Sequence, residues 1–548
     1  MPPKAPPAAS PPPARPLWPP RRVFITLASL ATAIALVWMG LLETLVGGIV
    51  DAAVRNIITL ILGFAAFTSV LCWFVFESGH SARLKRAVGA GALAVVAVAC
   101  ALLRIERVSG DLVPELVFRW TPPRDRLLPQ ATATPPAADA AWEATPRDYP
   151  RFLGPSESGS LDGPALDPAW DRSPPERLWR RPIGAGWGGF ATCGDHAVTL
   201  EQRGDEEIIS CQAVPTGEIE WTVSVPGRHE TVLGGVGPRS TPTIADGVVY
   251  ATGATGWLHA IDGATGRVLW RKNVLDDLGI DVAAHAAAVT WGRAGSPLVT
   301  GSLVIVPGGG PLEQGGTAVS LAAYDRSTGD RRWTGGEQQI SYVSPELVEI
   351  GGREGILTVN ESSVACHDPA DGRELWRFDW PGHSNSDATC SQSHVLADGR
   401  IFISKGYGVG AAVFAAVGDA AAFTPVWTQP AALKTKFTNV VVHDGHAYGL
   451  SDGILECVAL ADGKRKWKGG RYGQGQVLRV GGHLVVQSEP GDVVLVACMP
   501  ERHDVVARFA ALDGQTWNNP CLSGDRLLVR NAEEAACYRL RLAADPAP

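Results

Sequence analysis

Hydrophobic residues are distributed in two different ways along this chain. Near the N-terminus they form three long runs, at residues 23–42, 57–76 and 87–103. Each run is long enough to span a bilayer, although the third is barely so. Beyond about residue 150 the apolar stretches are short and β-rich, and they follow Asp-Gly or Gly-Gly pairs such as those at 246–247 and 481–482. The first pattern predicts three transmembrane helices, and the second predicts short strands joined by tight turns.

Eight tryptophans mark a repeat within the second region. They recur at intervals of 40 to 63 residues, a spacing typical of a radial repeat. A glycine stands four residues before five of them, where it supplies the positive φ of a tight hairpin. A small residue stands ten residues before seven of them, which indicates close packing between neighbours. The tryptophans are Trp179, Trp221, Trp270, Trp333, Trp376, Trp427, Trp467 and Trp517; the glycines are Gly217, Gly266, Gly329, Gly372 and Gly463; the small residues are Cys211, Ala260, Ala323, Cys366, Val417, Cys457 and Ala507.

Each repeat contains four short strands, the last of which carries the tryptophan, and such a unit is a propeller blade. Three strands follow Trp517 without a closing tryptophan, whereas the strand at 176–182 carries Trp179 without a blade before it. We expect these two ends of the chain to complete one blade together. The sequence therefore predicts an all-β, eight-bladed β-propeller over residues 151–542, closed by strand 176–182, which leaves no long bare sheet edge.

This repeat resembles the pyrroloquinoline-quinone-type propeller repeat, which is shared by quinoprotein dehydrogenases and by the scaffold lipoprotein of the outer-membrane β-barrel assembly machinery. Residues 404–414, 434–437 and 466–476 are also similar to stretches of uncharacterised bacterial membrane-anchored quinoprotein-like propellers. The resemblance covers about residues 150–542 and implies the fold, whereas activity does not transfer with it. Other all-β repeats fit less well, because Trp-Asp occurs only at 170–171, outside the repeat.

Positive charge predicts an orientation for the three spans. Arg21 and Arg22 precede the first span, and Arg83, Lys85 and Arg86 lie between the second and the third. Because positively charged loops remain in the cytoplasm, we expect an integral protein of the cytoplasmic (inner) membrane whose propeller faces the periplasm or the exterior. A signal peptide is the alternative for the first run, but two more runs follow it and no small-residue cleavage site stands out.

Composition predicts the character of the regions outside the spans and the propeller, and it argues against one class of partner. Residues 1–22 and 543–548 are expected to be disordered tails, and the Pro- and Ala-rich residues 105–150 a linker. The net charge of −8, with no basic run in the propeller, argues against nucleic acid as a partner. Several of the ten cysteines occupy the small-residue position of the repeat, where a free thiol behaves as a small hydrophobe. The pairing of the other cysteines of the propeller stays open.

The channel of a propeller is lined by the innermost segment of each blade, and here these segments are polar and aromatic. Cations in them are candidates for holding an anionic ligand or the carboxylates of a protein partner, and aromatic rings are candidates for a stacking face. The alternative is that these groups cap and hydrate a water-filled channel. The candidates are the cations Arg239, Arg293, Lys434 and Lys436, the rings Trp291 and Tyr472, and the amides Gln392 and Gln476.

Two function classes compete for this channel, and a third hypothesis is a membrane sensor with the propeller as its input domain, although no cytoplasmic output module is recognisable. The resemblance implies a quinone- and calcium-dependent alcohol or sugar dehydrogenase, but the adjacent cysteine pair of many such enzymes is missing and no catalytic aspartate can be matched. We therefore expect a binding or scaffold module for a protein or small ligand, with no cofactor, no metal site and no assigned catalytic residue. His443 and His446 flank a turn and are close enough for a shared metal, although exposed turn residues are more common. Charge reversal of Arg239, Arg293 and Lys436 together is expected to abolish capture and to leave the melting temperature nearly unchanged.

Overall fold

The computed structural model describes residues 15–40, 51–129, 142–418 and 422–543. The chain divides into two compact units, Met1–Thr121 and Pro122–Pro548, and each is described by itself. Of the two expected tails, residues 1–14 and 544–548 lie outside the described residues.

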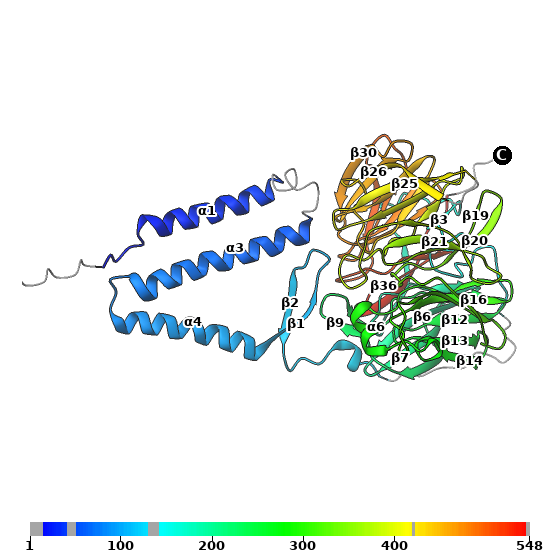
Figure 1. Ribbon diagram of the computed structural model, residues 1–548, viewed down its shortest axis with the longest axis horizontal. Coiled ribbons are helices and arrows are strands. Elements are labelled where there is room, and N and C mark those ends of the chain that lie inside the picture. The colour runs from blue at the N-terminus through cyan, green and yellow to red at the C-terminus, as the bar shows by residue number, and fades with distance from the viewer. Residues whose placement is uncertain (1–14, 41–50, 130–141, 419–421, 544–548) are drawn as a thin grey trace, which may run out of the picture. The chain divides into compact units, whose positions relative to one another are not determined.

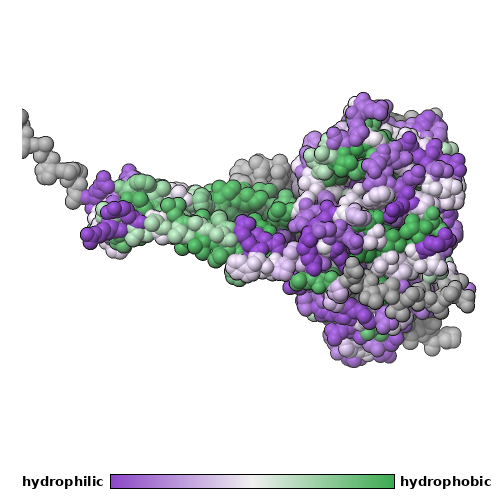
Figure 2. Space-filling model, turned by 90° about the horizontal axis from the view of Figure 1, so that it is seen from below, coloured by the Kyte–Doolittle hydropathy of each residue, from purple (hydrophilic) through white to green (hydrophobic). Residues whose placement is uncertain are grey.

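The N-terminal unit contains the helices α1 (Arg21–Trp38), α3 (Ala52–Cys72, continued by the π-helical turn η1, Trp73–Glu77) and α4 (Ala82–Leu102). Among the described residues, three helical segments are long and apolar enough to cross a membrane, namely Arg21–Trp38, Ala52–Glu77 and Ala82–Leu102. Helix α1 packs beside α3, and α4 contacts η1 (Figure 1). Hydrophobic side chains cover the outside of these helices (Figure 2), as expected for segments whose solvent is lipid.

The helices differ from their predicted bounds, and part of the predicted linker is folded. Helix α1 begins at Arg21 and therefore includes the last two residues of the expected tail. Strands β1 (Leu103–Val108) and β2 (Pro114–Phe118) pair as an antiparallel hairpin inside the expected linker, and the 3-10 turn η2 (Arg124–Arg126) follows. The residues expected to form a linker thus include most of a hairpin, which the alternation of apolar and charged side chains in 103–118 favours.

The second unit is an eight-bladed β-propeller, as predicted (Figure 1). Blades 1 to 4 are β5–β8 (Ala191–Cys193, His196–Arg203, Glu206–Ala213, Ile219–Pro226), β11–β14 (Thr243–Ala245, Val248–Thr252, Trp257–Asp262, Val268–Asn273), β15–β18 (Leu298–Thr300, Leu303–Gly309, Val319–Asp325, Arg331–Gly335) and β19–β22 (Glu346–Ile350, Arg353–Val359, Ser363–His367, Glu374–Asp379).

Blades 5 to 7 are β23–β26 (His394–Val395, Ile401–Lys405, Gly410–Val417, Ala422–Gln429), β27–β30 (Val440–His443, His446–Ser451, Ile454–Ala459, Arg465–Arg471) and β31–β34 (Gln476–Val480, His483–Gln487, Asp492–Ala497, Val505–Ala510). The short strand β3 (Ser160–Leu161) pairs in parallel with β31. Two insertions stand between blades, namely the hairpin β9 (Glu230–Thr231) and β10 (Gly235–Val236), and the helices α5 (Val274–Leu278) and α6 (Val282–Ala288).

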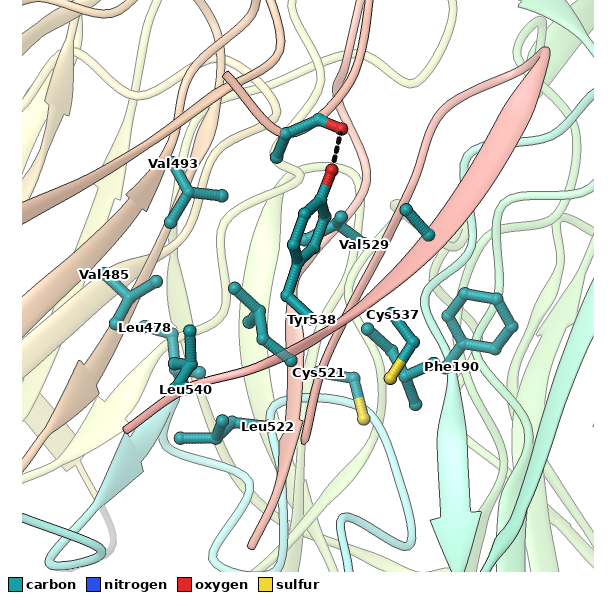
Figure 3. Close-up of a cluster of buried hydrophobic side chains, with 14 of the residues drawn as sticks. Phe190, Leu478, Val485, Val493, Cys521, Leu522, Val529, Cys537, Tyr538 and Leu540 are labelled. Carbon is teal, nitrogen blue, oxygen red and sulfur yellow. Dashed lines mark hydrogen bonds between the residues drawn. The ribbon is translucent and has the colours of Figure 1, made fainter. Parts of the chain in front are cut away.

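Blade 8 joins the two ends of the propeller sequence. Its first three strands are β35 (Cys521–Ser523), β36 (Arg526–Arg530) and β37 (Glu534–Arg539), and its fourth is β4 (Glu176–Pro182). Strand β4 pairs antiparallel with β37, and Cys537 lies opposite Trp179. The core between blades 7 and 8 includes Val493, Val529 and Tyr538, whose hydroxyl donates to the Ala511 carbonyl at 2.7 Å (Figure 3).

Seven of the eight repeat tryptophans occupy equivalent places in the outer strand of a blade. The pairs across the third and fourth strands are Cys211–Trp221, Ala260–Trp270, Ala323–Trp333, Cys366–Trp376, Val413–Trp427, Cys457–Trp467 and Cys537–Trp179. Two positions correct the predicted register. In blade 5 a longer hairpin places Val413, rather than Val417, opposite Trp427. In blade 7 Leu495 lies opposite Ala507, so Ala507 takes the place of the tryptophan, and Trp517 lies beyond β34.

The repeated glycines join each blade to the tryptophan of the preceding one. The five predicted glycines have positive φ, between 69° and 76°, which confirms their role in the hairpin turn. They also lie against an indole ring: a Cβ added at Gly217 would come within 2.6 Å of Trp179, and one at Gly329 within 2.7 Å of Trp270. The indole N–H of Trp179 then donates to the Val214 carbonyl of blade 1 at 2.7 Å, and similar bonds follow at later blade boundaries.

Candidate functional site

A second set of contacts joins the blades around the central channel. One position at the start of each innermost segment faces the same position of the next blade, and we call this set the inner ring. Its members are Gly189, Thr241, Ser296, Ser344, Gln392, Asn439, Gln476 and Asn519. The Gly189 amide donates to Thr241 Oγ1 at 3.0 Å, and the Thr241 amide donates to Ser296 Oγ at 2.9 Å. Side chains of one blade thus satisfy backbone amides of the previous blade, which a buried segment requires.

Two predicted ligand residues, Gln392 and Gln476, belong to this inner ring. Gln392 Nε2 donates to the Ser344 carbonyl at 2.8 Å, which joins blade 5 to blade 4. Gln476 accepts from the Asn439 amide at 3.2 Å and donates to the Trp517 carbonyl at 2.9 Å, so it joins three consecutive blades. Both side chains are buried. Their position shows a structural role in joining blades.

The segment 149–161 crosses one end of the channel, which we call the plugged end. The Tyr149 carbonyl accepts from Thr192 of β5, and the Pro150 carbonyl accepts from Ile244 of β11. On the other side of the channel the Gly159 carbonyl accepts from Arg479 of β31. The cavity left beneath this segment measures about 10 Å³, room for about one water. It is lined by Arg151, Phe152, Glu157, Thr243, Ser296, Pro297, Ser344, Pro345 and Gln392.

Two carboxyl groups lie at this plugged end. Glu157 accepts from Arg151 Nη1 at 2.6 Å, and Glu346 accepts from Gln392 Nε2 at 3.5 Å. Burial raises the pKa of Glu346 to about 8, and the negative charge of Glu157 contributes in the same direction. Glu346 is therefore largely protonated at neutral pH, because the low dielectric of its site disfavours the charged form.

Aromatic rings gather at the opposite end, in the residues that precede the inner ring, and we call this the aromatic end. The ring centroids of Trp187 and Trp517 are 4.7 Å apart, and those of Phe437 and Trp517 are 4.6 Å apart. Trp291 and Tyr342 form a second pair at 5.3 Å. Trp187, Trp291 and Phe437 are half-buried, so each keeps part of its ring accessible. Rings in this state offer a large apolar contact with little loss of side-chain entropy.

The hairpin β9–β10 is fixed at this end by Arg239 and Trp187. Arg239 Nη2 donates to the Gly234 carbonyl at 2.6 Å, and Trp187 Nε1 donates to the same oxygen at 2.8 Å. Burial lowers the pKa of Arg239 to about 10, which leaves it cationic at neutral pH. At the hairpin tip Val232 and Leu233 are 58% and 53% exposed. The hydrogen bonds of Arg239 and Trp187 thus fix a turn that exposes two adjacent aliphatic side chains to solvent.

The other predicted cations and Tyr472 are occupied by contacts within the protein. Arg293 is buried and donates to the carbonyls of Gly308 and Pro307. Lys434 pairs with Asp452 at 2.5 Å, Tyr472 shares a hydrogen bond with His503 at 2.9 Å, and Lys436 is buried. Reversal of the Arg293 charge would bury a carboxylate against two carbonyl oxygens. We therefore expect it to lower the melting temperature, in contrast to the expectation from the sequence.

The sequence did not select the rings that form the aromatic end. The innermost segments were expected to be polar and aromatic, but of the rings at this end only Trp291 was chosen as a ligand residue. Trp517 was assigned to the outer strands because it continues the tryptophan repeat. It lacks a glycine four residues before it, but so do Trp179 and Trp427, which lie in outer strands, so the sequence did not distinguish Trp517 from them.

A calcium-dependent quinone would need a group of oxygen ligands in the channel. Calcium prefers six to eight oxygen ligands, several of them carboxylates. The carboxylates near the aromatic end are already engaged: Glu207 accepts from the Ala254 amide at 2.6 Å, and Glu489 accepts from Trp517 Nε1 at 3.1 Å. In the described part of the chain, three metal-ligating side chains meet only in the outer strands of blade 1, at His196, Cys211 and Glu220. His446 Nδ1 contacts the Asp444 carbonyl at 2.8 Å.

Comparison with known proteins assigns the family. Residues 169–341, 204–469 and 360–536, which overlap, match the family described as Outer membrane protein assembly factor BamB. The chain belongs to this family. It is also 28% identical over 151 residues to quinohemoprotein alcohol dehydrogenase ADH-IIG of Pseudomonas putida, which covers 26% of this chain and 19% of that protein.

Two further proteins are similar to this chain. The chain is 24% identical over 215 residues to tetrathionate hydrolase of Acidithiobacillus ferrooxidans, covering 36% of this chain and 37% of the relative. It thus spans well under half the length of the curated relatives that it matches. The crystal structure of quinohemoprotein alcohol dehydrogenase from Comamonas testosteroni aligns with a TM-score of 0.53 at 13% identity, covering 75% of this chain and 83% of that one. This likeness shows the fold alone.

Proposed function

We propose that this chain is a membrane-anchored, extracytoplasmic binding module that captures a protein or small ligand at the aromatic end of its propeller. The observation that supports this proposal is that the two ends of the channel differ in what covers them. The segment 149–161 is hydrogen-bonded across one end, whereas the other presents half-buried rings at Trp187, Trp291 and Phe437. Aromatic residues are enriched in the contact regions of protein interfaces and ligand pockets.

The hairpin β9–β10 supports a protein partner in particular. Val232 and Leu233 remain exposed at its tip although the hydrogen bonds of Arg239 and Trp187 hold the turn in place. A fixed apolar tip loses little conformational entropy on binding, which favours its use as an anchor. A dehydrogenase is the weaker alternative, since a general base must be free to take a proton. Glu207 and Glu489 instead already accept hydrogen bonds from the protein.

The orientation follows from the charges beside the helices. Arg83, Lys85 and Arg86 lie at the start of α4, directly after the turn from η1, and this turn should stay in the cytoplasm. The chain would then leave the membrane on the outer side after Leu102. Protease added to intact spheroplasts should degrade the propeller and spare the helices. Protection of the whole chain would contradict this orientation.

Site-specific photo-crosslinking tests the binding surface in the native membrane. A photoreactive residue at Leu233 should give a discrete crosslinked species, because this side chain lies at the proposed surface. Val505 is the matched control, since it is 45% exposed but lies in β34, the outer strand of blade 7. Equal crosslinking from both positions, or a species from Val505 alone, would place the partner elsewhere.

A further inference from the structure

Three potential metal ligands meet on one face of blade 1. His196 begins β6, Cys211 lies in β7 and Glu220 lies in β8. His196 Nδ1 and Glu220 Oε2 are 2.7 Å apart, and the Cys211 thiol donates to the same oxygen at 3.2 Å. All three ligand atoms lie within 4.8 Å of one another. None of these three residues belongs to the inner ring or to the aromatic end, and the cluster takes no part in the proposed function.

The register of the sheet explains why these three side chains share a face. His196 lies opposite Ala213, which is two residues from Cys211 and therefore points to the same side of β7. Cys211 lies opposite Trp221 and Gln212 opposite Ile219, so Glu220 is the extra residue of a β-bulge. A bulge redirects a side chain that regular pairing would place on the other face. Glu220 consequently reaches the imidazole and the thiol.

The other blades contain the same bulge but lack the carboxylate. The residues at the place of Glu220 are Leu269, Arg332, Leu375, Val426, Lys466, Val506 and Leu178 in blades 2 to 8. Blade 6 is the most informative comparison, because His446 and Cys457 take the places of His196 and Cys211, and Lys466 replaces the carboxylate. The fold alone therefore does not produce the cluster, and blade 6 provides an internal control that carries a positive charge instead.

The surroundings leave one side of the cluster open to solvent. Cys211 is buried, whereas the side chains of His196 and Glu220 are 17% and 14% exposed. The Trp142 ring stacks on the His196 imidazole, with centroids 5.0 Å apart and an interplanar angle of 12°. This contact fixes the orientation of the ring, as partners around metal ligands commonly do. The open side provides room for a water ligand.

We propose that His196, Cys211 and Glu220 form a zinc site whose fourth ligand is water. Thiolate, imidazole and carboxylate are the three protein ligand types that zinc accepts, and a three-ligand site with water is a common arrangement. Zinc–ligand bonds of about 2.0 to 2.3 Å place tetrahedral ligand atoms roughly 3.3 to 3.7 Å apart. The imidazole and carboxylate must therefore separate by less than about 1 Å, a change within reach of their side-chain torsions.

Binding changes the protonation of two ligands. The thiol proton of Cys211, which is donated to Glu220 in the metal-free protein, leaves to the solvent as the thiolate binds the metal. His196 Nδ1 donates to Glu220 in the metal-free protein, so this nitrogen gives up its proton when it binds the metal, and the neutral imidazole then carries its proton on Nε2. The metal then joins β6, β7 and β8, so zinc should raise the melting temperature, and the rise should continue as the free zinc concentration increases beyond the dissociation constant.

Equilibrium dialysis of the full-length protein in detergent, against zinc buffered by a chelator, tests the site. We expect one zinc per chain, and at least tenfold weaker binding for Cys211→Ala and for Glu220→Gln. Alanine stands naturally at the equivalent places Ala260 and Ala323, so Cys211→Ala preserves the packing. Cys457→Ala, the matched control in blade 6, should bind as the wild type does.

Cobalt provides a second measurement that reports the thiolate directly. Cobalt bound by a thiolate shows a charge-transfer absorption in the near ultraviolet, which should appear in the wild type and in Cys457→Ala and vanish in Cys211→Ala. The proposal is overturned if the wild type binds zinc no more tightly than Cys211→Ala, or if Cys457→Ala weakens binding to the same extent. Circular dichroism identifies any variant that fails to fold. If Cys211→Ala fails to fold, the zinc affinity of Glu220→Gln relative to the wild type decides the outcome.

Discussion

Neighbouring blades are joined at two radii, and the two joints have different chemistry. At the outer radius one pair of residue types recurs: an indole lies on the glycine of the next blade, as Trp270 lies on Gly329, and donates to a carbonyl of that blade, as Trp270 does to Arg326. At the inner radius threonine, serine, asparagine and glutamine serve in turn. At five joints the flat ring lies against a glycine, where a Cβ would clash, and at Trp376 it meets the Phe423 ring instead. In the inner joint, by contrast, any short side chain with an oxygen can accept from an amide.

The outer joint should contribute the larger share of stability. Trp270→Ala removes a buried ring together with its hydrogen bond to Arg326, and we expect a loss of about 3 to 5 kcal/mol in the free energy of unfolding. The adjacent Leu269→Ala is the control, because Leu269 is 39% exposed on the same strand, and its loss should stay near about 0.5 kcal/mol. Denaturant unfolding followed by circular dichroism measures both. Equal losses would contradict the importance of the tryptophan joint.

The cost of placing a Cβ against the indole ring can be measured separately from the cost of the positive φ of the glycine. Gly329 and Gly445 have nearly the same φ, 75° and 72°, so alanine costs about 1 to 2 kcal/mol at either position. Only Gly329 also faces a ring: its Cβ would come within 2.7 Å of Trp270, whereas a Cβ at Gly445 meets nothing within 4 Å. We expect Gly329→Ala to lose a further amount of about 1 to 3 kcal/mol from overpacking. Similar unfolding midpoints for the two variants would show that φ alone requires glycine.

The inner joint should respond less to the loss of one contact. Thr241→Val keeps the shape of the side chain but leaves the buried Gly189 amide without its acceptor. We expect a loss of about 1 to 2 kcal/mol, towards the lower end of the usual cost of a buried unsatisfied group. Thr241→Ser restores the hydroxyl and should recover most of that loss. If serine and valine destabilise equally, packing of the methyl group rather than the hydrogen bond joins blades 1 and 2.

The two joints also explain what the sequence could predict. The number of blades and the closing strand followed from the outer joint, because its tryptophan and glycine recur at a fixed distance from one another. The inner joint leaves no such pattern, since its residues are as varied as those of a ligand site. Gln392 and Gln476 were therefore interpreted as ligand residues, although their bonds run between blades. The aromatic end depends on rings from separate blades, and the distance from Trp187 to Trp517 is set by ring closure, which local sequence does not encode.

A titratable group at one inner joint gives the smallest expected effect and the most specific one. Gln392 joins blades 4 and 5 beside Glu346, whose pKa is raised from 4.5 to about 8 by burial and by the charge of Glu157. Because the folded protein holds this proton more tightly than the unfolded chain, the stabilisation is complete below about pH 4.5 and is lost as the pH rises through about 8. The slope cannot exceed about 1.4 kcal/mol per pH unit for one group, and we expect a loss of about 1 kcal/mol between pH 7 and 8. Glu346→Gln should remove this loss, and Glu157→Gln should move it to lower pH, because the charge that raises the pKa of Glu346 is then gone. Unfolding midpoints measured across this range distinguish the outcomes. A variant Glu346→Gln that keeps the wild-type slope would mean that the inner joint is insensitive to pH, as the outer joint of indoles and glycines should be.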